Sequence, residues 1–453
     1  MYDAEIVVGP EALKRALDEK DALRAKALLE ELYPAQILEY WPEFDPAQRL
    51  SILTILPPAD AAEVFSHLEE TEQAELLKIL PPWRVKELLA ELSLDDLADT
   101  INSVEEENPA QAEALLQQLD PQTRAEVMEL TEYDEDEAGG IMTSEYIAVR
   151  DSMRVEEVFR FLRRKAPDAE QIYVIYVVDA QQRLDGVLTL RDLIVADPKV
   201  RVAEIMNPDV IFARDDIDQE EVAHLMADYN FTVLPVVDEG HKLVGIVTVD
   251  DVVDVIQEEA TEDIYRLGAV ESPELVYSKS NVWQLWSARV RWLVILIAAG
   301  SLTSTILQGF ESVLAAMTAL AFYVPVLIQT GGNTGSQGST LIVRALALRD
   351  VGIRDWPHIL RKELGVGLLM GVTLAALLSI KVLIDGQLEL LPVIAISLAL
   401  VVLVANITGS MLPLLLRKLK RDPALISSPL ITTVTDVVGL LVYLSVARWL
   451  LEL

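Results

Sequence analysis

The sequence contains no cysteine and only four histidines, which are scattered along the chain. Disulfides and thiolate metal sites are therefore excluded, and no histidine pair has the spacing of a zinc or copper site. No nucleophile is placed beside a base, and the one glycine-rich run lacks the Gly-Lys-Ser/Thr of a phosphate-binding loop. These absences predict that the protein is not an enzyme.

Basic residues are also scarce, with 37 Lys and Arg against 72 Asp and Glu, a net charge of −35. Residues 282–453 carry 13 basic and 9 acidic residues, which leaves 24 and 63 for the preceding part, a net charge of −39 there. Yet 51% of the chain is hydrophobic and the mean hydropathy is +0.30. Such segregation indicates an acidic soluble part followed by an apolar, membrane-embedded part.

Five apolar segments in the second part are each long enough for the roughly 20 residues of a membrane-spanning helix. They cover residues 292–309, 314–342, 364–384, 389–416 and 426–450. The connections after the second and fourth segments are rich in Arg and Lys, whereas the other two are not. We therefore expect a protein of the cell's inner membrane. The positive-inside rule places the basic loops and the acidic part in the cytoplasm and the C-terminus outside.

Asp436 lies in the middle of the last apolar segment, SSPLITTVTDVVGLLVYLSVARWL. At about 1.5 Å per residue it lies on the order of 12 Å along a helix that begins near Ser428 and Pro429. A carboxylate within a bilayer costs about 2.5–3.5 kcal/mol on insertion scales. No Lys or Arg is available at that depth, so an ion site is favoured over a structural carboxylate. Asn333, in the run QTGGNTGSQGST, and Asn406 are further polar candidates for lining a path.

The soluble part contains two kinds of repeat. In residues 1–132, Ile-Leu-Pro-Pro at 55–58 recurs at 79–82, which predicts stacked short helices that begin at the prolines. In residues 138–258, YVVDAQQRLDGVLTLRDLI at 176–194 matches PVVDEGHKLVGIVTVDDVV at 235–253. The second repeat alternates strand and helix patterns and predicts two α/β units.

The second repeat resembles a tandem pair of cystathionine-β-synthase (CBS) domains, over residues 138–200 and 201–262. The resemblance implies a regulatory pair. Such a pair binds ATP or another adenine nucleotide, or it regulates without binding a nucleotide. Thr189, Arg191 and Asp192 match positions that often hold ribose and phosphate in that family.

Acidic clusters account for much of the negative charge. One contains Asp95 and Asp99, a second contains Asp218 and Glu220, and a third runs from 249 to 263 with Asp251, Asp254, Glu259, Glu262 and Asp263. Each could be a solvated helix face, but together they favour hard divalent cations, Mg²⁺ or Ca²⁺, that relieve the repulsion.

The order of these parts resembles the MgtE-type magnesium transporters along essentially the whole chain. VLIQTGGNTGSQGSTL, FYVPV and SPLITTVTDVVGLLVYLSVAR carry the resemblance most specifically. It implies an all-α superhelical N-terminal domain (1–132), the CBS pair, a connecting plug helix (263–282) and an α-helical five-span membrane domain (283–453). It also implies a homodimer whose Asp436 residues bind Mg²⁺ in a path between the copies.

The same resemblance implies a gate that closes when cytoplasmic Mg²⁺ bridges acidic faces. Glu63 and Asp95 would face Glu220, Asp251 and Asp254, while Glu259, Glu262 and Asp263 would meet Asp422. Ser428 and Thr432 would line the path where the family has Asn and Ala. Asn230 replaces an acidic residue and Val174 replaces an aromatic residue of the family pattern.

Three rival hypotheses remain from the sequence. A CBS-regulated anion channel would require basic residues in the spans, and none is buried there. A membrane-tethered nucleotide sensor would not need Asp436. A transporter for another divalent cation, such as Mn²⁺, Co²⁺ or Ca²⁺, would use the same residues.

Overall fold

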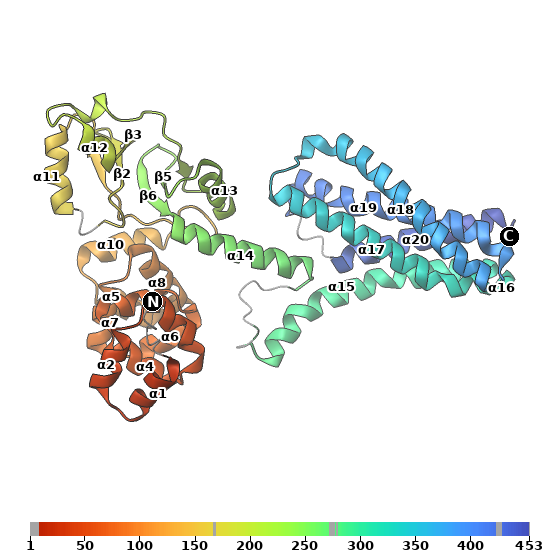
Figure 1. The fold of residues 1–453 in the computed structure, drawn as a ribbon, viewed down its shortest axis with the longest axis horizontal. Coiled ribbons are helices and arrows are strands. Elements are labelled where there is room, and N and C mark those ends of the chain that lie inside the picture. The colour runs from red at the N-terminus through yellow and green to blue at the C-terminus, as the bar shows by residue number, and fades with distance from the viewer. Residues whose placement is uncertain (1–8, 166–168, 271–276, 278–279, 423–427, 453) are drawn as a thin grey trace, which may run out of the picture. The chain divides into compact units, whose positions relative to one another are not determined.

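The computed structural model describes residues 9–165, 169–270, 277, 280–422 and 428–452. The chain forms two compact units, Met1–Ile256 and Gln257–Leu453. The first unit contains the N-terminal helices and the two α/β repeats, and the second contains the long apolar helices (Figure 1).

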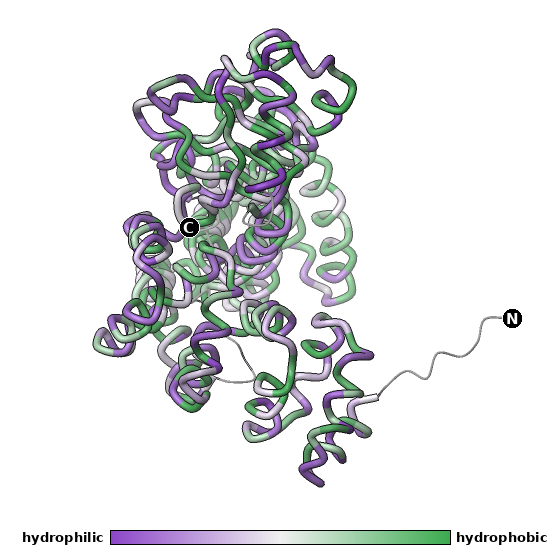
Figure 2. The backbone as a smooth tube through the Cα atoms, turned by 90° about the vertical axis from the view of Figure 1, so that its left-hand side faces the viewer, coloured by the Kyte–Doolittle hydropathy of each residue, from purple (hydrophilic) through white to green (hydrophobic). Residues whose placement is uncertain are grey.

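Ten short helices form the N-terminal part of the first unit. They are α1 (Pro10–Asp18), α2 (Ala22–Leu29), α3 (Pro34–Tyr40), α4 (Pro46–Ile55), α5 (Pro58–Ser66), α6 (Glu70–Ile79), α7 (Pro82–Leu89), α8 (Leu94–Glu107), α9 (Pro109–Leu116) and α10 (Pro121–Leu130). Pro58 and Pro82 begin α5 and α7, which confirms the helix starts predicted from the repeat. Proline suits the first helical position because its missing N–H has no partner there. In Figure 2, hydrophilic and hydrophobic positions alternate along this part of the tube. Such alternation is expected of helices that bury one face against their neighbours and expose the other to solvent.

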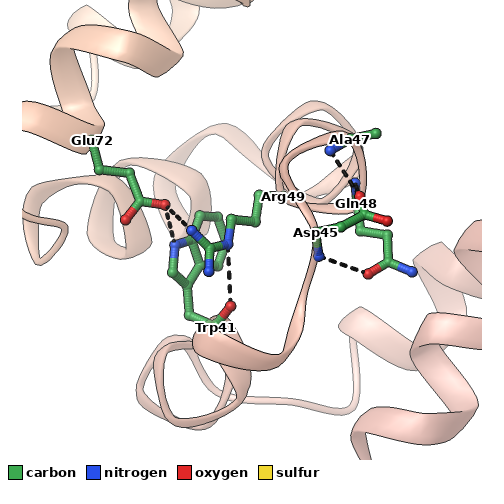
Figure 3. Close-up of polar contacts among 6 residues, drawn as sticks. All are labelled: Trp41, Asp45, Ala47, Gln48, Arg49 and Glu72. Carbon is green, nitrogen blue, oxygen red and sulfur yellow. Dashed lines mark hydrogen bonds and ion pairs between the residues drawn. The ribbon is translucent and has the colours of Figure 1, made fainter. Parts of the chain in front are cut away.

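Polar contacts fix the turns between these helices (Figure 3). Asp45 caps α4 by accepting from the backbone N–H groups of Ala47 and Gln48, both at 2.9 Å. Oε1 of Glu72 on α6 accepts from Nη1 of Arg49 at 2.7 Å and from the indole N–H of Trp41 at 2.8 Å. These partly buried groups are therefore satisfied, and α4 and α6 are joined to the turn that follows α3.

Each α/β repeat contributes a three-stranded sheet, ordered β1-β2-β3 and β4-β5-β6. The first repeat contains β1 (Ala148–Arg150), α11 (Val155–Lys165), β2 (Val174–Val178), β3 (Leu184–Thr189) and α12 (Leu190–Val195). The second contains β4 (Ala213–Arg214), α13 (Gln219–Tyr229), β5 (Val233–Val237), β6 (Leu243–Thr248) and α14 (Val249–Leu267). In both sheets the first strand pair is parallel and the second antiparallel.

The two repeats exchange their entry segments. A Cβ on Gly186 in β3 would lie 2.7 Å from the sulfur of Met206, and one on Gly245 in β6 would lie 2.5 Å from that of Met142. The methionine that precedes each repeat therefore packs on the sheet of the other repeat. Glycine allows this close packing, because any side chain at these two positions would push the methionine aside.

The second unit is helical. It contains α15 (Val282–Gly309), α16 (Glu311–Ala316), α17 (Ala319–Ala347), α18 (Trp356–Ile384), α19 (Leu391–Lys418) and α20 (Ser428–Leu450). Helices α17, α19 and α20 pack against one another, α18 packs on α19, and α15 packs on α20. A buried core around Leu320, Tyr323, Val393, Leu440 and Leu444 holds this bundle together.

Four helical segments of the described chain are long and apolar enough to cross a membrane: Val282–Gly309, Ile353–Ile384, Leu388–Lys418 and Ser428–Leu450. The remaining predicted span, 314–342, corresponds to α17, which has the length but carries the polar run at 329–340 in its middle. Gly331, Gly332, Thr334, Gly335 and Gly338 of this run are buried in the bundle. A polar helix is tolerated at membrane depth when other helices enclose it.

The connecting helix predicted for 263–282 differs from the structure. Helix α14 ends at Leu267, and Ala269 adopts a φ of 57°, which a continuing helix cannot accommodate. Helix α15 begins at Val282, capped by Asn281, which accepts from the N–H groups of Trp283 and Gln284. Residues 271–276 and 278–279 lie outside the described part of the chain.

Candidate ion path and cation-sensing sites

Asp436 lies two turns into α20 and is half-buried against α17. A Cβ built on Gly332 of α17 would lie 3.4 Å from Oδ1 of Asp436 and 2.7 Å from Cγ2 of Thr432. The missing side chain at Gly332 thus lets the carboxylate lie directly beside the neighbouring helix. Oδ1 is enclosed and has no hydrogen-bond partner among the described residues. A buried acceptor without a donor is costly, so this carboxylate calls for a cation or its water.

Three hydroxyl groups lie on the same side of the bundle as Asp436. Ser428 and Thr432 precede it by eight and four residues on α20, so all three share one helix face. Ser336 on α17 completes the group: Oγ of Ser428 donates to Oγ of Ser336 at 3.0 Å. Oγ of Ser336 also lies 3.4 Å from Oγ1 of Thr432. We call Ser336, Ser428 and Thr432 the hydroxyl cluster.

Small residues allow the three central helices to approach closely. A Cβ on Gly409 of α19 would lie 2.1 Å from the carbonyl oxygen of Gly335 on α17, so only glycine fits there. A Cβ on Gly331 would lie 2.9 Å from a methyl group of Val401. Such small-residue contacts are the usual way in which membrane helices pack at short distance.

Asn333 and Asn406 occupy different environments. Asn333 is exposed on α17, in line with exposed Gln329 and Gln337. A pocket of about 550 Å³ lies between this polar side of α17 and α18, with Asn333, Gln337 and Thr373 in its lining. A polar surface of this kind fits an aqueous path or a protein interface, because lipid tails cannot satisfy amide groups.

Asn406, predicted to line the path, is instead 3% exposed between helices. Its Nδ2 donates to the backbone oxygen of Glu363 on α18 at 2.9 Å and to Oε2 of the same residue at 2.8 Å. The amide therefore joins α19 to α18. Sequence inspection missed Glu363 because it precedes the apolar stretch that marked the third span.

A group of carboxylates gathers where α8 meets the α/β repeats. Asp95 and Asp96 on α8 interact electrostatically with Asp250 at the start of α14, and Asp95 also interacts with Asp251. Two residues that the sequence did not single out, Glu145 and Glu170 before β1 and β2, interact with Asp95 as well. We call this group the acidic cluster; its members are Asp95, Asp96, Asp99, Glu145, Glu170, Asp250 and Asp251.

The electrostatics of the acidic cluster favour neutralisation. Desolvation, followed by the charges of Asp95 and Asp96, raises the pKa of Asp99 to about 8. Desolvation and the charge of Asp95 raise the pKa of Asp251 to about 7. Oδ1 of Asp95 is enclosed without a hydrogen-bond partner in the described chain. Protons or a divalent cation would therefore stabilise the cluster.

No three His, Asp or Glu side chains among the described residues converge closely enough to form a metal site. The other predicted ligands of the first unit, on α5, α13 and α14, are not members of the acidic cluster. Asp218 caps α13 by accepting from the N–H of Glu220 at 2.9 Å, and the Glu220 carboxylate lies 3.6 Å from His224. Glu63 on α5 and Asp254 on α14 are exposed, and no described contact joins them to Asp95.

Glu262 and Asp422 are brought together in the second unit. The guanidinium group of Arg266, one turn after Glu262 on α14, forms ion pairs with both carboxylates. Asp422 lies in the basic loop after α19, so this contact ties the end of α14 to the bundle. Glu259 and Asp263 lie on the same end of α14. The sequence predicted the acidic partners but missed the Arg266 cation between them.

Comparison with known proteins identifies the family. A divalent cation transporter model (MgtE) matches residues 324–446, the MgtE intracellular N domain matches 32–136, and the CBS domain matches 138–199 and 202–258. The chain is 63% identical to the magnesium transporter MgtE of Thermus thermophilus over 441 residues, which cover 97% of this chain and 98% of that protein. The chain belongs to the MgtE family.

A further relative and a solved structure extend this finding. The magnesium transporter MgtE of Enterococcus faecalis is 36% identical over 71% of each chain. A crystal structure of the cytosolic domain of the Mg²⁺ channel MgtE in complex with ATP is 62% identical, with a TM-score of 0.53, and covers 55% of this chain and 100% of that one. The fold class predicted from the sequence, with helical N-terminal, tandem CBS and helical C-terminal parts, is confirmed.

Two departures from the MgtE pattern have local explanations. Asn230 ends α13 with a φ of 54°, a left-handed conformation that Asn adopts more readily than Asp or Glu. Val174 begins β2 and follows Tyr173, which is 72% exposed. Thr189 and Asp192 form a capping box at α12, in which Oγ1 of Thr189 donates to Oδ2 of Asp192 at 2.6 Å, and Arg191 is exposed beside them.

Proposed function

We propose that this chain conducts Mg²⁺ across the membrane into the cytoplasm, down its electrochemical gradient. The observation that carries the proposal is Asp436, a half-buried carboxylate with an enclosed, unpartnered oxygen in a bundle of membrane-length helices. The relatives named as magnesium transporters support it, since one is 63% identical over nearly the whole chain. A membrane potential of 100 mV supplies about 4.6 kcal/mol per dication, so no coupled hydrolysis is needed.

In this proposal the protein acts as a homodimer with the path between the copies. Two Asp436 carboxylates then face one dication. Mg²⁺ gives up its water reluctantly, so a site built from two carboxylates and flanking hydroxyls suits an ion that keeps most of its hydration shell. The exposed polar side of α17 with Gln329, Asn333 and Gln337 supports burial against a second copy or water. In this proposal α17 completes the five spans, so the two ends of the chain lie on opposite sides of the membrane. The basic loops then favour an N-terminal part in the cytoplasm and a C-terminus outside.

The gate in this proposal is set by cytoplasmic Mg²⁺ at two places. Ions at the acidic cluster neutralise repulsion between α8, α14 and the first CBS domain. Ions near Glu259, Glu262, Asp263 and Asp422 stabilise the contact between α14 and the bundle, where Arg266 already supplies one positive charge. Each site binds Mg²⁺ more tightly in the closed state than in the open state. Several such weak sites together shift the equilibrium toward the closed state as Mg²⁺ rises.

The CBS pair adds a proposed adenine-nucleotide site near Thr189, Arg191 and Asp192. A 62% identical cytosolic domain has been crystallised with ATP, which supports nucleotide binding here. Tyr173 provides an exposed ring against which an adenine could stack.

The test is Mg²⁺ flux into liposomes that contain the purified full-length chain, measured with an entrapped Mg²⁺-sensitive dye. We expect influx that is driven by a negative internal potential and that falls as Mg²⁺ rises on the cytoplasmic face. Absence of flux under all internal Mg²⁺ concentrations would refute transport and favour a membrane-tethered sensor. Equal flux of Ca²⁺ or Mn²⁺ would refute selectivity for Mg²⁺ and leave a divalent cation transporter.

A further inference from the structure

We propose that the outward face at the start of α18 is a binding site for the headgroup of an anionic phospholipid. The site consists of Arg354, His358, Arg361 and Lys362, which we call the basic stripe. The ligand class is a phosphate ester that carries acyl chains, such as phosphatidylglycerol. The inference concerns how the helical bundle is held in its membrane, and it is independent of the ion that the path conducts.

The basic stripe lies along one face of a helix. His358, Arg361 and Lys362 have the three- and four-residue spacings that place side chains on one helix face. Arg354, in the turn before α18, precedes His358 by four residues. All four residues are exposed, and within the described part of the chain the side chains of the two arginines and the lysine form no ion pair or hydrogen bond. Three cations therefore share this face without a carboxylate to balance them.

The acidic residues between positions 353 and 363 are engaged elsewhere. Oδ2 of Asp355 accepts from the backbone N–H of Gly352 at 2.8 Å. Glu363 lies on the opposite side of α18, where its Oε2 accepts from Nδ2 of Asn406 on α19 at 2.8 Å. The positive charge of the basic stripe is therefore available to a ligand from outside the bundle.

The same helix face continues into a surface suited to lipid tails. Gly365, Leu369 and Val372 follow the basic stripe at the same helical spacings. Leu369 is 72% exposed and Val372 is 58% exposed, as expected of side chains that face lipid on a membrane-length helix. At about 1.5 Å per residue, Lys362 lies roughly 10 Å along the axis from Leu369. The cations therefore lie at headgroup depth when the leucine contacts acyl chains.

Two neighbouring residues fit this depth. Trp356, at the start of α18, is 53% exposed, and tryptophan is enriched where a membrane meets water. A Cβ on Gly365 would meet no atom within 4 Å. Packing between the described helices therefore does not explain this glycine, whereas its small size leaves room for a headgroup beside Arg361 and Lys362.

Charge selects the occupant of this face. Each Lys or Arg near an anionic membrane surface strengthens attraction about fivefold, and the guanidinium group of Arg binds phosphate through two parallel hydrogen bonds. A zwitterionic headgroup has no net charge and gains much less. A second copy of the chain that docked by the same face would bring like charges together. The face therefore favours an anionic phospholipid over both.

The experiment is native mass spectrometry of the full-length chain in detergent, with equal amounts of phosphatidylglycerol and phosphatidylcholine. We expect the unmodified chain to retain phosphatidylglycerol in excess, and the double variant Arg361→Gln/Lys362→Gln to lower the ratio of the two lipids at least tenfold. Lys418→Gln/Lys420→Gln is the matched control, because it removes two exposed cations from another basic loop and should keep the ratio. Glycerol phosphate, which has no acyl chains, should not displace the lipid at the same concentration.

The inference is overturned if Arg361→Gln/Lys362→Gln keeps the lipid ratio of the control. It is also overturned if the control loses the ratio as fully, because diffuse attraction to the basic loops would then explain the preference. Displacement by glycerol phosphate would identify a site for a free phosphate ester in place of a lipid. A smaller oligomer in the variant, with an unchanged lipid ratio, would assign the face to a second copy. A variant that fails to fold is recognised by its elution profile, and Arg354→Gln, for which we expect a smaller loss in the same direction, then decides the question.

Discussion

Neutralising Asp95 should stabilise the first unit when Mg²⁺ is absent. The charge of Asp95 contributes to the raised pKa of Asp99, Glu145 and Asp251, and its own Oδ1 is enclosed without a partner. Asp95→Asn removes that charge and keeps the shape. The closed, Mg²⁺-bound arrangement should in turn lose a ligand.

The magnitude follows from Coulomb's law. A pair of like charges at an effective dielectric constant of about 20 costs about 4 kcal/mol at 4 Å and half of that at twice the separation. We take a separation of about 8 Å for the order of magnitude. We therefore expect a gain of about 2 kcal/mol without Mg²⁺, or a rise in melting temperature of about 4–8 °C for a unit of this size.

The assay is thermal unfolding of the full-length chain at about pH 9, where Asp99 and Asp251 are ionised, with a chelator and with Mg²⁺. Asp95→Asn should melt higher than the unmodified chain in the chelator and gain less from added Mg²⁺. Glu105→Gln, on the exposed side of the same helix, is the matched control. If both variants melt alike in the chelator and respond alike to Mg²⁺, repulsion at the acidic cluster does not drive the sensor.

Three other perturbations follow from the same contacts. Desolvation raises the pKa of Asp99 to about 8 and that of Asp251 to about 7, so the folded unit binds more protons than the unfolded chain. Its melting temperature without Mg²⁺ should therefore fall as the pH rises from about 4 to about 8. A flat profile would contradict these shifts. Arg266→Gln removes partly exposed ion pairs that stabilise the closed state by on the order of 1 kcal/mol. It should therefore raise the Mg²⁺ concentration that halves flux about fivefold. An unchanged or lower concentration would show that these ion pairs do not stabilise the closed gate. Asn406→Leu leaves Glu363 without its amide donor and should destabilise the bundle by about 1–3 kcal/mol in a detergent melt, whereas unaltered stability would show that the interhelical bond contributes nothing.

Local features of the sequence predicted local structure well. Pro58 and Pro82 mark helix starts because proline fits the first helical position, and the two α/β repeats show the same strand pairing because their patterns match. Family membership followed from the order of the parts. These properties depend on neighbours in the chain, which the sequence displays directly.

Contacts between distant elements could not be predicted in the same way. Glu145 and Glu170 join the acidic cluster, and Ser336 joins Ser428, only because separate elements meet in space. Asn406 looked like a lining residue in its apolar segment, although its partner Glu363 is 43 positions away. Such pairings depend on packing, which hydropathy and spacing leave open.

The predicted connecting helix shows a different limit. The family resemblance implied a helix through residues 263–282, but α14 ends at Leu267 and Ala269 is left-handed. The acidic residues Glu259, Glu262 and Asp263 of α14 therefore lie near the end of a helix that stops beside Arg266. A helix end is determined by the backbone conformation of one or two residues, and a family resemblance does not specify it.

The central claim is that Asp436 holds the transported ion. The most direct measurement compares Mg²⁺ influx into liposomes for the unmodified chain and for Asp436→Asn, which keeps the shape and removes the charge, with Thr433→Val as the control. We predict that Asp436→Asn reduces influx at least a hundredfold while the control conducts normally and both variants elute as the unmodified chain does. Undiminished influx through Asp436→Asn would show that the carboxylate is structural and that Mg²⁺ follows another path.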